Sequence, residues 1–91
     1  MATLMDLVAE IDTLAAEDVV FAKPEWNELS EARVFQLTDD FRPPPEAGAL
    51  GYAYLLEVDL IRQVLEEFTG TPDATLAEKC RRIIQYATFD A

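Results

Sequence analysis

Apolar residues recur three and four positions apart in three stretches of the chain. These stretches are residues 3–16, 59–68 and 75–87. The spacing puts the apolar side chains of each stretch on one face of an α-helix. Thr3 with Asp6, and Thr75 with Glu78, are typical of helix N-terminal caps, because a hydroxyl and a carboxyl group three positions later bind free backbone N–H groups. The pattern predicts a helix in each stretch.

Three other stretches are short and rich in β-branched, aromatic or large aliphatic residues, which is typical of strands. They are residues 18–22, 32–37 and 52–58. The first has consecutive β-branched and aromatic residues and is expected to be buried on both faces or at an interface. The first two are expected to pair antiparallel across the loop between them. The third, which is the most apolar, is predicted to be the central strand.

A proline-rich connector separates the second and third predicted strands. Its three successive prolines, residues 43–45, favour an extended backbone, and Pro45 suits the first position of a short helical turn. The connector is long enough for a crossover, which would let the third strand run parallel to the second.

Residues 51–70 change from a continuous apolar run to helical spacing at Asp59. Asp59 is expected to cap the helix, and Gly70 and Pro72 are expected to end it. One long helix over residues 50–68 is the alternative. The strand-to-helix corner is favoured because residues 52–58 offer almost no polar face to such a helix. The sequence thus predicts a single α+β domain over residues 1–91, with a small mixed sheet of about three strands packed by three helices in the order α-β-β-β-α-α.

The net negative charge limits the kinds of macromolecule that the protein is expected to bind. The chain has 18 acidic and 7 basic residues, a net charge of −11, and no histidine. Such a polyanion has few cations to place on phosphates, so nucleic-acid binding is not expected, and anionic membrane surfaces repel it. The same field would attract a basic protein partner. Eleven of the acids lie in residues 1–46, so the first helix and the first two strands are expected to face that partner.

The residue types leave little room for catalysis or for metal binding. The single cysteine, Cys80, falls on the apolar stripe of the last predicted helix and is interpreted as an inert core residue. Asp39 and Asp40 are adjacent but lack the alternating spacing of a calcium loop. No cofactor, no metal and no catalytic residue is predicted, and we expect the protein not to be an enzyme. Acidic residues near the N-terminus, where a signal peptide would be basic, favour a cytoplasmic location.

The positions of three side chains in the third predicted strand can also be predicted. Glu57 interrupts the apolar run, so it is expected at the rim of the sheet or partly buried beside a partner such as Arg62. Tyr52 and Tyr54 alternate with Ala53 and are expected on one face of the strand, a face more often core than binding site.

A polar loop between the first two strands supplies the predicted binding residues. Trp26 lies there among Glu25, Glu28 and Glu31. A tryptophan in a polar loop is typical of an interface anchor, because it buries a large area at low entropic cost. The alternative is that Trp26 folds back onto the end of the sheet. These four residues are the predicted partner-binding site.

The stretches "VVFAKPEWNELSEARVFQL" and "GYAYLLEVDLIRQVLEEF" together resemble a pattern found in small acidic bacterial proteins of uncharacterised function. The resemblance rests on the Phe-Ala-x-Pro-x-Trp loop, on residues 30–32 and on residues 56–58. It covers roughly half of the chain and implies neither an activity nor catalytic residues.

The leading hypothesis is a non-enzymatic cytoplasmic interaction protein that binds a basic protein partner. Its sharpest version is an acidic inhibitor or immunity-type module that masks a basic active site. Two alternatives stay open. One is a structural or regulatory homo-oligomer, because apolar strands can leave a face that self-associates. The other is a polyanionic mimic of DNA, which requires carboxylates in rows on one face.

Overall fold

The computed structural model describes residues 1–90, and its centre is a three-stranded sheet. The strands are β1 (Val19–Ala22), β2 (Ala32–Phe35) and β3 (Ala53–Glu57). Their order in the sheet is β2-β1-β3, and both neighbours run antiparallel to β1. β2 and β3 therefore run in the same direction without pairing.

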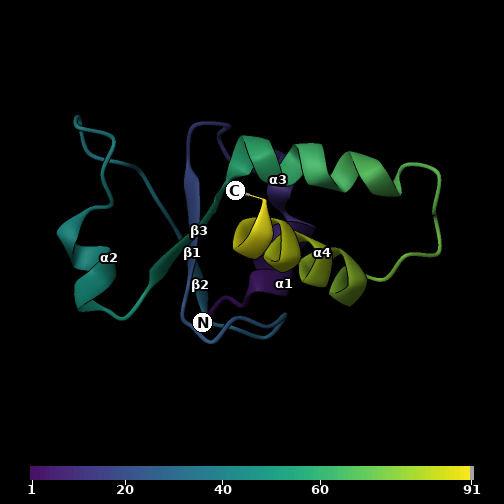
Figure 1. Ribbon diagram of the computed structural model, residues 1–91, viewed down its shortest axis with the longest axis horizontal. Coiled ribbons are helices and arrows are strands. Elements are labelled where there is room, and N and C mark those ends of the chain that lie inside the picture. Colours follow the sequence, from purple (N-terminus) through teal and green to yellow (C-terminus); the bar gives the residue numbers. More distant parts are fainter. Residues whose placement is uncertain (91) are drawn as a thin grey trace.

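Helices cover the two faces of this sheet very unequally (Figure 1). The helices are α1 (Leu4–Ala9), α2 (Pro45–Ala49), α3 (Val58–Leu65) and α4 (Leu76–Phe89), with 3₁₀ turns at Ile11–Thr13 and Glu66–Phe68. α1, α3 and α4 lie on one side, and only the five-residue α2 lies on the other. One face of the sheet is consequently deeply covered and the other is thinly covered.

The predicted α+β class and element order are confirmed, whereas three details differ. The sheet is antiparallel throughout rather than mixed. The central strand is β1 rather than the third strand, because β1 is the strand whose four residues are all buried. The helix predicted over residues 3–16 is confined to α1 and the following 3₁₀ turn.

The predicted helix ends are largely confirmed. Thr3 accepts a hydrogen bond from the Asp6 N–H, and the Asp6 carboxylate accepts one from the Thr3 N–H, which completes a capping box. Thr75 likewise accepts from the Glu78 N–H. α2 begins at Pro45, as expected for a proline in the first helical turn. The predicted Asp59 cap is wrong: Glu57 is at the N-cap position without a side-chain cap bond, α3 begins at Val58, and Asp59 lies in its first turn. The α-helix ends at Leu65, and the 3₁₀ turn Glu66–Phe68 fills the rest of the predicted helix before Gly70.

A β-bulge explains why β3 has large apolar residues at the consecutive positions Leu55 and Leu56. Pairing with β1 shifts register between Val20 and Phe21, opposite Leu55. The extra residue lets Leu55 and Leu56 both turn toward the helices, where they are 2% and 1% exposed. Without the bulge, strict alternation would send one of the two leucines to the opposite face.

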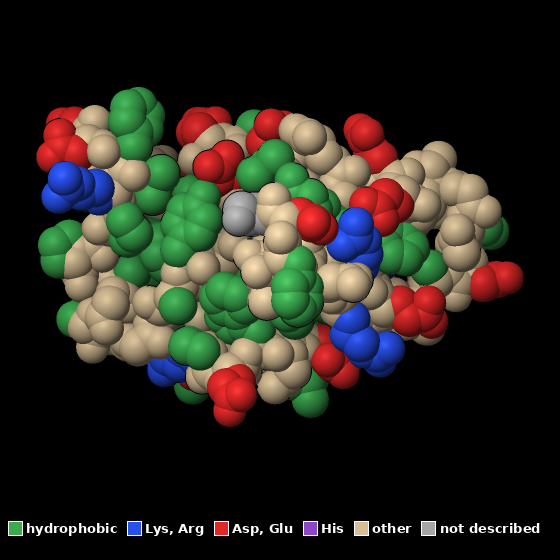
Figure 2. Space-filling model, viewed as in Figure 1, with side chains coloured by type: hydrophobic (Ala, Val, Ile, Leu, Met, Phe, Trp, Pro, Cys, Tyr) green, Lys and Arg blue, Asp and Glu red, His purple; other side chains and the backbone are tan. Residues whose placement is uncertain are grey.

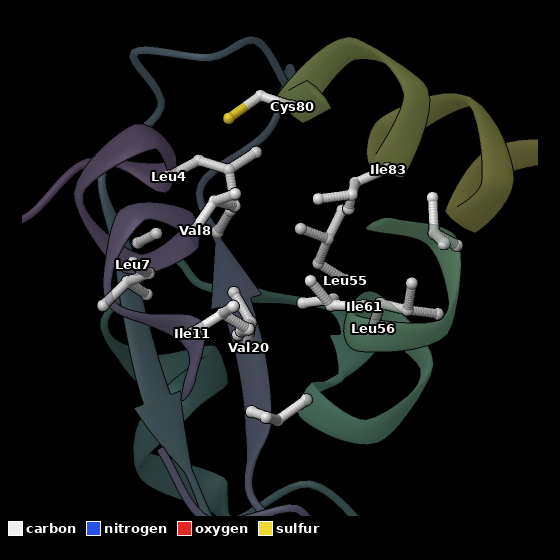
Figure 3. Packing of buried hydrophobic residues seen from close by; sticks show 14 residues of the cluster. Leu4, Leu7, Val8, Ile11, Val20, Leu55, Leu56, Ile61, Cys80 and Ile83 are labelled. Atoms are coloured by element: carbon white, nitrogen blue, oxygen red, sulfur yellow. The ribbon is translucent and has the colours of Figure 1, made fainter. Parts of the chain in front are cut away.

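The larger core lies between the sheet and α1, α3 and α4 (Figure 3). Leu4 and Val8 from α1 face Cys80 and Ile83 from α4, with Leu55 of β3 beneath. A smaller cluster on the other face joins Val19, Phe21 and Phe35 to Ala47 of α2. Burial of these apolar side chains is the main source of stability in a chain of this size.

Candidate functional site

The structure places Trp26 in the fold rather than on an open surface. Its ring is partly buried and packs against the larger core. Its indole N–H donates a hydrogen bond of 3.0 Å to the Ala22 carbonyl at the end of β1. Trp26 therefore adopts the fold-back alternative, because an indole that closes the end of a strand satisfies both its apolar ring and its polar N–H.

Two of the three predicted acidic residues in the same loop are also engaged within the chain. Glu28 lies 4.0 Å from Arg81 of α4, and Glu31 lies 3.2 Å from Lys23. Glu25 is exposed, and its backbone carbonyl accepts a hydrogen bond of 3.3 Å from the Ser30 hydroxyl. The loop is thus built from internal contacts, and among its predicted binding residues only the Glu25 side chain faces solvent without a recorded contact.

The thinly covered face of the sheet carries a continuous set of aromatic rings. Phe21 makes edge-to-face contacts with Phe35 and Tyr54 at centroid distances of 5.1 and 5.6 Å, and Phe35 contacts Tyr52 at 5.7 Å. Edge-to-face pairs of this kind stabilise beyond simple burial. As expected, Tyr52 and Tyr54 share one face. Tyr52 is largely covered, whereas Tyr54 is 37% exposed.

One end of this aromatic face is held by a hydrogen-bonded charge cluster. The Tyr52 hydroxyl donates to Glu31 Oε2 at 2.6 Å, and Lys23 lies over the Tyr52 ring at 5.2 Å. Hydrogen bonds from Tyr52 and Lys23 lower the pKa of the Glu31 carboxyl. The bond to Glu31 and burial raise the pKa of the Tyr52 phenol. The cluster keeps Glu31 charged and Tyr52 neutral.

The other end of the aromatic face carries Tyr54 and Glu57. The Tyr54 hydroxyl donates to Glu57 Oε1 at 3.0 Å. Burial, and then this bond, raise the pKa of Tyr54 to about 12. The suggested pairing of Glu57 with Arg62 is wrong: Arg62 lies on the helical side and donates to the carbonyls of Ile11 and Leu14.

Most carboxylates have no cation within salt-bridge distance. Five of the 18 acidic residues take part in ion pairs among residues 1–90, which leaves 13 without one. The described part of the chain also lacks any group of three acidic or thiol side chains able to hold a metal ion.

Six acidic side chains lie at the end of the sheet where β1 starts and β2 and β3 stop. We call this region the acidic edge; it consists of Glu17, Asp18, Asp39, Asp40, Glu57 and Asp59. None of the six takes part in an ion pair within residues 1–90. The antiparallel register creates the edge, because Val19 pairs with both Phe35 and Glu57. Backbone bonds from Val58 to the Asp18 carbonyl (2.9 Å) and from Asp59 to the Ala16 carbonyl (3.3 Å) hold the start of α3 against the same end.

A tight loop extends the acidic edge beyond β2. The Thr38 N–H donates to the Arg42 carbonyl at 2.8 Å, so Asp39 and Asp40 lie at the loop tip. Phe41 in this loop has a φ of 60° and is 84% exposed. It lines a shallow cavity of about 300 Å³ together with Glu17. An exposed aromatic ring thus lies beside carboxylates that come from two separate segments.

Acidic and apolar side chains are neighbours on the surface as well (Figure 2). Acidic side chains are spread along the upper border of this view, where α3 and the loop before β1 lie in Figure 1. A broad apolar area lies directly below them, between α2 and the end of α4. An exposed apolar area bordered by charged residues is typical of protein interaction surfaces.

The sole thiol lies far inside the helical layer. Cys80 is fully buried, and burial raises its pKa to about 11. A thiol of this kind stays protonated at neutral pH and is a poor nucleophile. This geometry agrees with the interpretation of Cys80 as a core residue.

Comparisons with protein-family models, with curated proteins and with solved structures found no match for the chain. The resemblance to small acidic bacterial proteins therefore stays a prediction. Across residues 1–90, none of the helices combines the length and the apolar character needed to cross a membrane.

The predicted partner-binding residues and the acidic edge are two different surfaces of the molecule. Tryptophan in a polar loop drew attention to residues 25–31, whereas the acidic edge combines residues 17–18, 39–40 and 57–59. The available signal was topological. Two antiparallel strands joined by a loop bring the residues before the first and after the second to the same end of a sheet.

Proposed function

We propose that this protein is a non-enzymatic interaction module whose acidic edge binds a basic segment of a protein partner. The observation that carries the proposal is the set of six carboxylates without an ion pair at one end of the sheet. A net charge of −11 accelerates the encounter with a basic partner, and local charge complementarity determines where that partner docks.

Aromatic side chains beside the carboxylates support the same surface. Tyr54 and Phe41 are both exposed, and each lies next to members of the acidic edge. Lysine and arginine side chains bind carboxylates through charge-assisted hydrogen bonds and bind aromatic faces through cation–π contacts. The acidic edge offers both kinds of contact, which is why we place the partner there rather than at Trp26.

Two variants of equal net charge test this proposal. The edge variant carries Glu17→Gln, Asp39→Asn and Asp40→Asn. The three positions are exposed, and their carboxylates make no hydrogen bond or ion pair within residues 1–90. The control variant carries Glu10→Gln, Asp73→Asn and Glu78→Gln, three exposed positions on the helical side. Each variant removes three negative charges, so a difference between them reports the position of the charges and not their number.

Immobilised wild-type and variant proteins would be incubated with lysate of the native host, and bound proteins would be quantified by mass spectrometry. We expect a basic protein that the wild type and the control variant retain and that the edge variant loses by about tenfold or more. Equal loss from both variants would show that net charge alone acts, and equal retention by both would contradict the proposal. A monomer–dimer equilibrium in sedimentation, together with no captured partner, would favour the homo-oligomer instead.

A further inference from the structure

A second candidate site lies on the helical side and shares no residue with the acidic edge. A cleft of about 400 Å³ opens between the end of α1, the end of α3 and the start of α4. Its apolar wall comes from all three helices and the 3₁₀ turn after α1. These residues are Val8, Ile11, Leu65 and Leu76. The volume falls within the range of small-molecule sites.

Two of the seven basic residues of the chain line this cleft. Arg62 projects from α3 and Lys79 from α4. No carboxylate of residues 1–90 lies within salt-bridge distance of Lys79. Three of the other five basic residues, Lys23, Arg81 and Arg82, already pair with carboxylates of the chain.

The Arg62 guanidinium is fixed in place but incompletely satisfied. Nη2 donates to the carbonyls of Ile11 and Leu14, which fixes the plane of the group. Nε is buried and has no hydrogen-bond acceptor. Its nearest carboxylate is Asp12 at 3.9 Å, and that side chain is 94% exposed. The Arg62 side chain as a whole is 31% exposed, so a ligand carboxylate would meet the accessible part of this fixed guanidinium rather than the buried Nε.

Negative charge in the same cleft determines the kind of ligand. Asp12 and Glu66 also line it, so the cleft holds two cations and two anions beside an apolar wall. A simple anion would meet repulsion from both carboxylates and from the net charge of −11. A zwitterion is neutral overall and can pair both of its charges. We propose that this cleft binds a small zwitterion with an apolar side chain, of the class of a free apolar α-amino acid.

The charges of the lining residues match the two charges of such a ligand. Arg62 and Lys79 receive the ligand carboxylate, Asp12 and Glu66 receive the ammonium group, and Leu65 and Leu76 contact the apolar side chain. This inference is independent of the proposed function, because the acidic edge contributes no residue to the cleft.

L-leucine is the probe, and its analogues 4-methylpentanoate and isopentylamine each lack one of its two charges. Titrations would be followed by ¹⁵N–¹H NMR. We expect L-leucine to produce saturable shifts in residues of the cleft, with a dissociation constant of about 1 mM or below. Each analogue should bind about tenfold more weakly, because it leaves one pair of charged groups unmatched.

Variants test whether L-leucine binds in the cleft or elsewhere on the surface. Lys79→Gln and Asp12→Asn should each weaken L-leucine binding by about tenfold. Arg33→Gln and Glu46→Gln, which alter exposed charges outside the cleft and outside the acidic edge, should leave it unchanged. The inference is overturned if L-leucine causes no saturable shift, if 4-methylpentanoate binds as tightly as L-leucine, or if the control variants lose as much affinity as the cleft variants.

Discussion

Substitution of Trp26 tests whether its indole stabilises the fold or is instead available to bind a partner. The two variants are Trp26→Ala and Trp26→Phe. The ring packs against the larger core, and its N–H donates to the Ala22 carbonyl at 3.0 Å. Removing about 100–150 Å² of buried ring at about 25 cal/mol per Å² costs about 3 kcal/mol. The lost hydrogen bond adds about 1 kcal/mol.

We therefore expect Trp26→Ala to lower the free energy of unfolding by about 4 kcal/mol. Trp26→Phe keeps most of the ring and should cost about 1–2 kcal/mol. These losses are large against the total of about 5–14 kcal/mol typical for 91 residues. Urea denaturation followed by far-UV circular dichroism measures them, because Trp26 is the sole tryptophan and its fluorescence is lost in both variants.

Leu29→Ala is the matched control, because Leu29 lies in the same loop and is 68% exposed. Its free energy of unfolding should stay within about 0.5 kcal/mol of the wild type. If both Trp26 variants also stay within that margin, the indole does not stabilise the fold and the reasoning is refuted.

Three further outcomes are expected. Burial and the bond to Glu57 raise the pKa of Tyr54 to about 12, so its neutral phenol contributes stability that is complete below pH 10 and is lost as pH rises toward 12. The stability difference between wild type and Tyr54→Phe should therefore shrink between pH 10 and pH 12 in urea denaturation, and a constant difference over this range would contradict the prediction. Glu31 has a lowered pKa, so its contribution to the free energy of unfolding is present above the ordinary carboxyl pKa of 4.5 and is lost as pH falls. The difference in the free energy of unfolding between wild type and Glu31→Gln should therefore disappear at acid pH. A difference that stays constant with pH would contradict the Tyr52 and Lys23 contacts. Cys80 should react with a thiol reagent at pH 8 only as fast as the fold opens, and an immediate reaction without denaturant would show that the thiol is not buried.

Local signals in the sequence predicted most of the elements. The Thr3 and Thr75 caps, the helical turn at Pro45 and the apolar β1 depend on neighbours within a few residues, and each is observed. Short-range hydrogen bonding and backbone restriction determine these features, so they can be recognised without knowledge of the rest of the fold.

Features that depend on distant pairing were missed. Apolar content suggested the third strand as the centre, yet its run of large residues results from the bulge at Leu55 and from an aromatic face that α2 covers thinly. The early end of the first helix was also missed, because the chain must turn at Ile11–Thr13 to enter β1. The position of a strand in a sheet follows from tertiary packing, and composition determines it poorly.

The candidate site was harder to predict than the fold. Trp26 offers one conspicuous side chain, whereas the acidic edge combines ordinary carboxylates from three segments that only the antiparallel topology brings together. The same holds for the cleft, where Asp12, Arg62 and Lys79 come from separate elements. No local motif marks either group.

The position of cation binding on the protein tests the role of the acidic edge directly. Uniformly ¹⁵N-labelled protein would be titrated with a tetra-arginine peptide at low salt and followed by NMR. The largest chemical-shift changes are expected at residues 17–18, 36–41 and 54–59. Their size should decrease at least severalfold in the edge variant but not in the control variant of equal charge. Shifts of similar size across all exposed carboxylates, or centred on residues 25–31, would contradict a binding surface at the acidic edge.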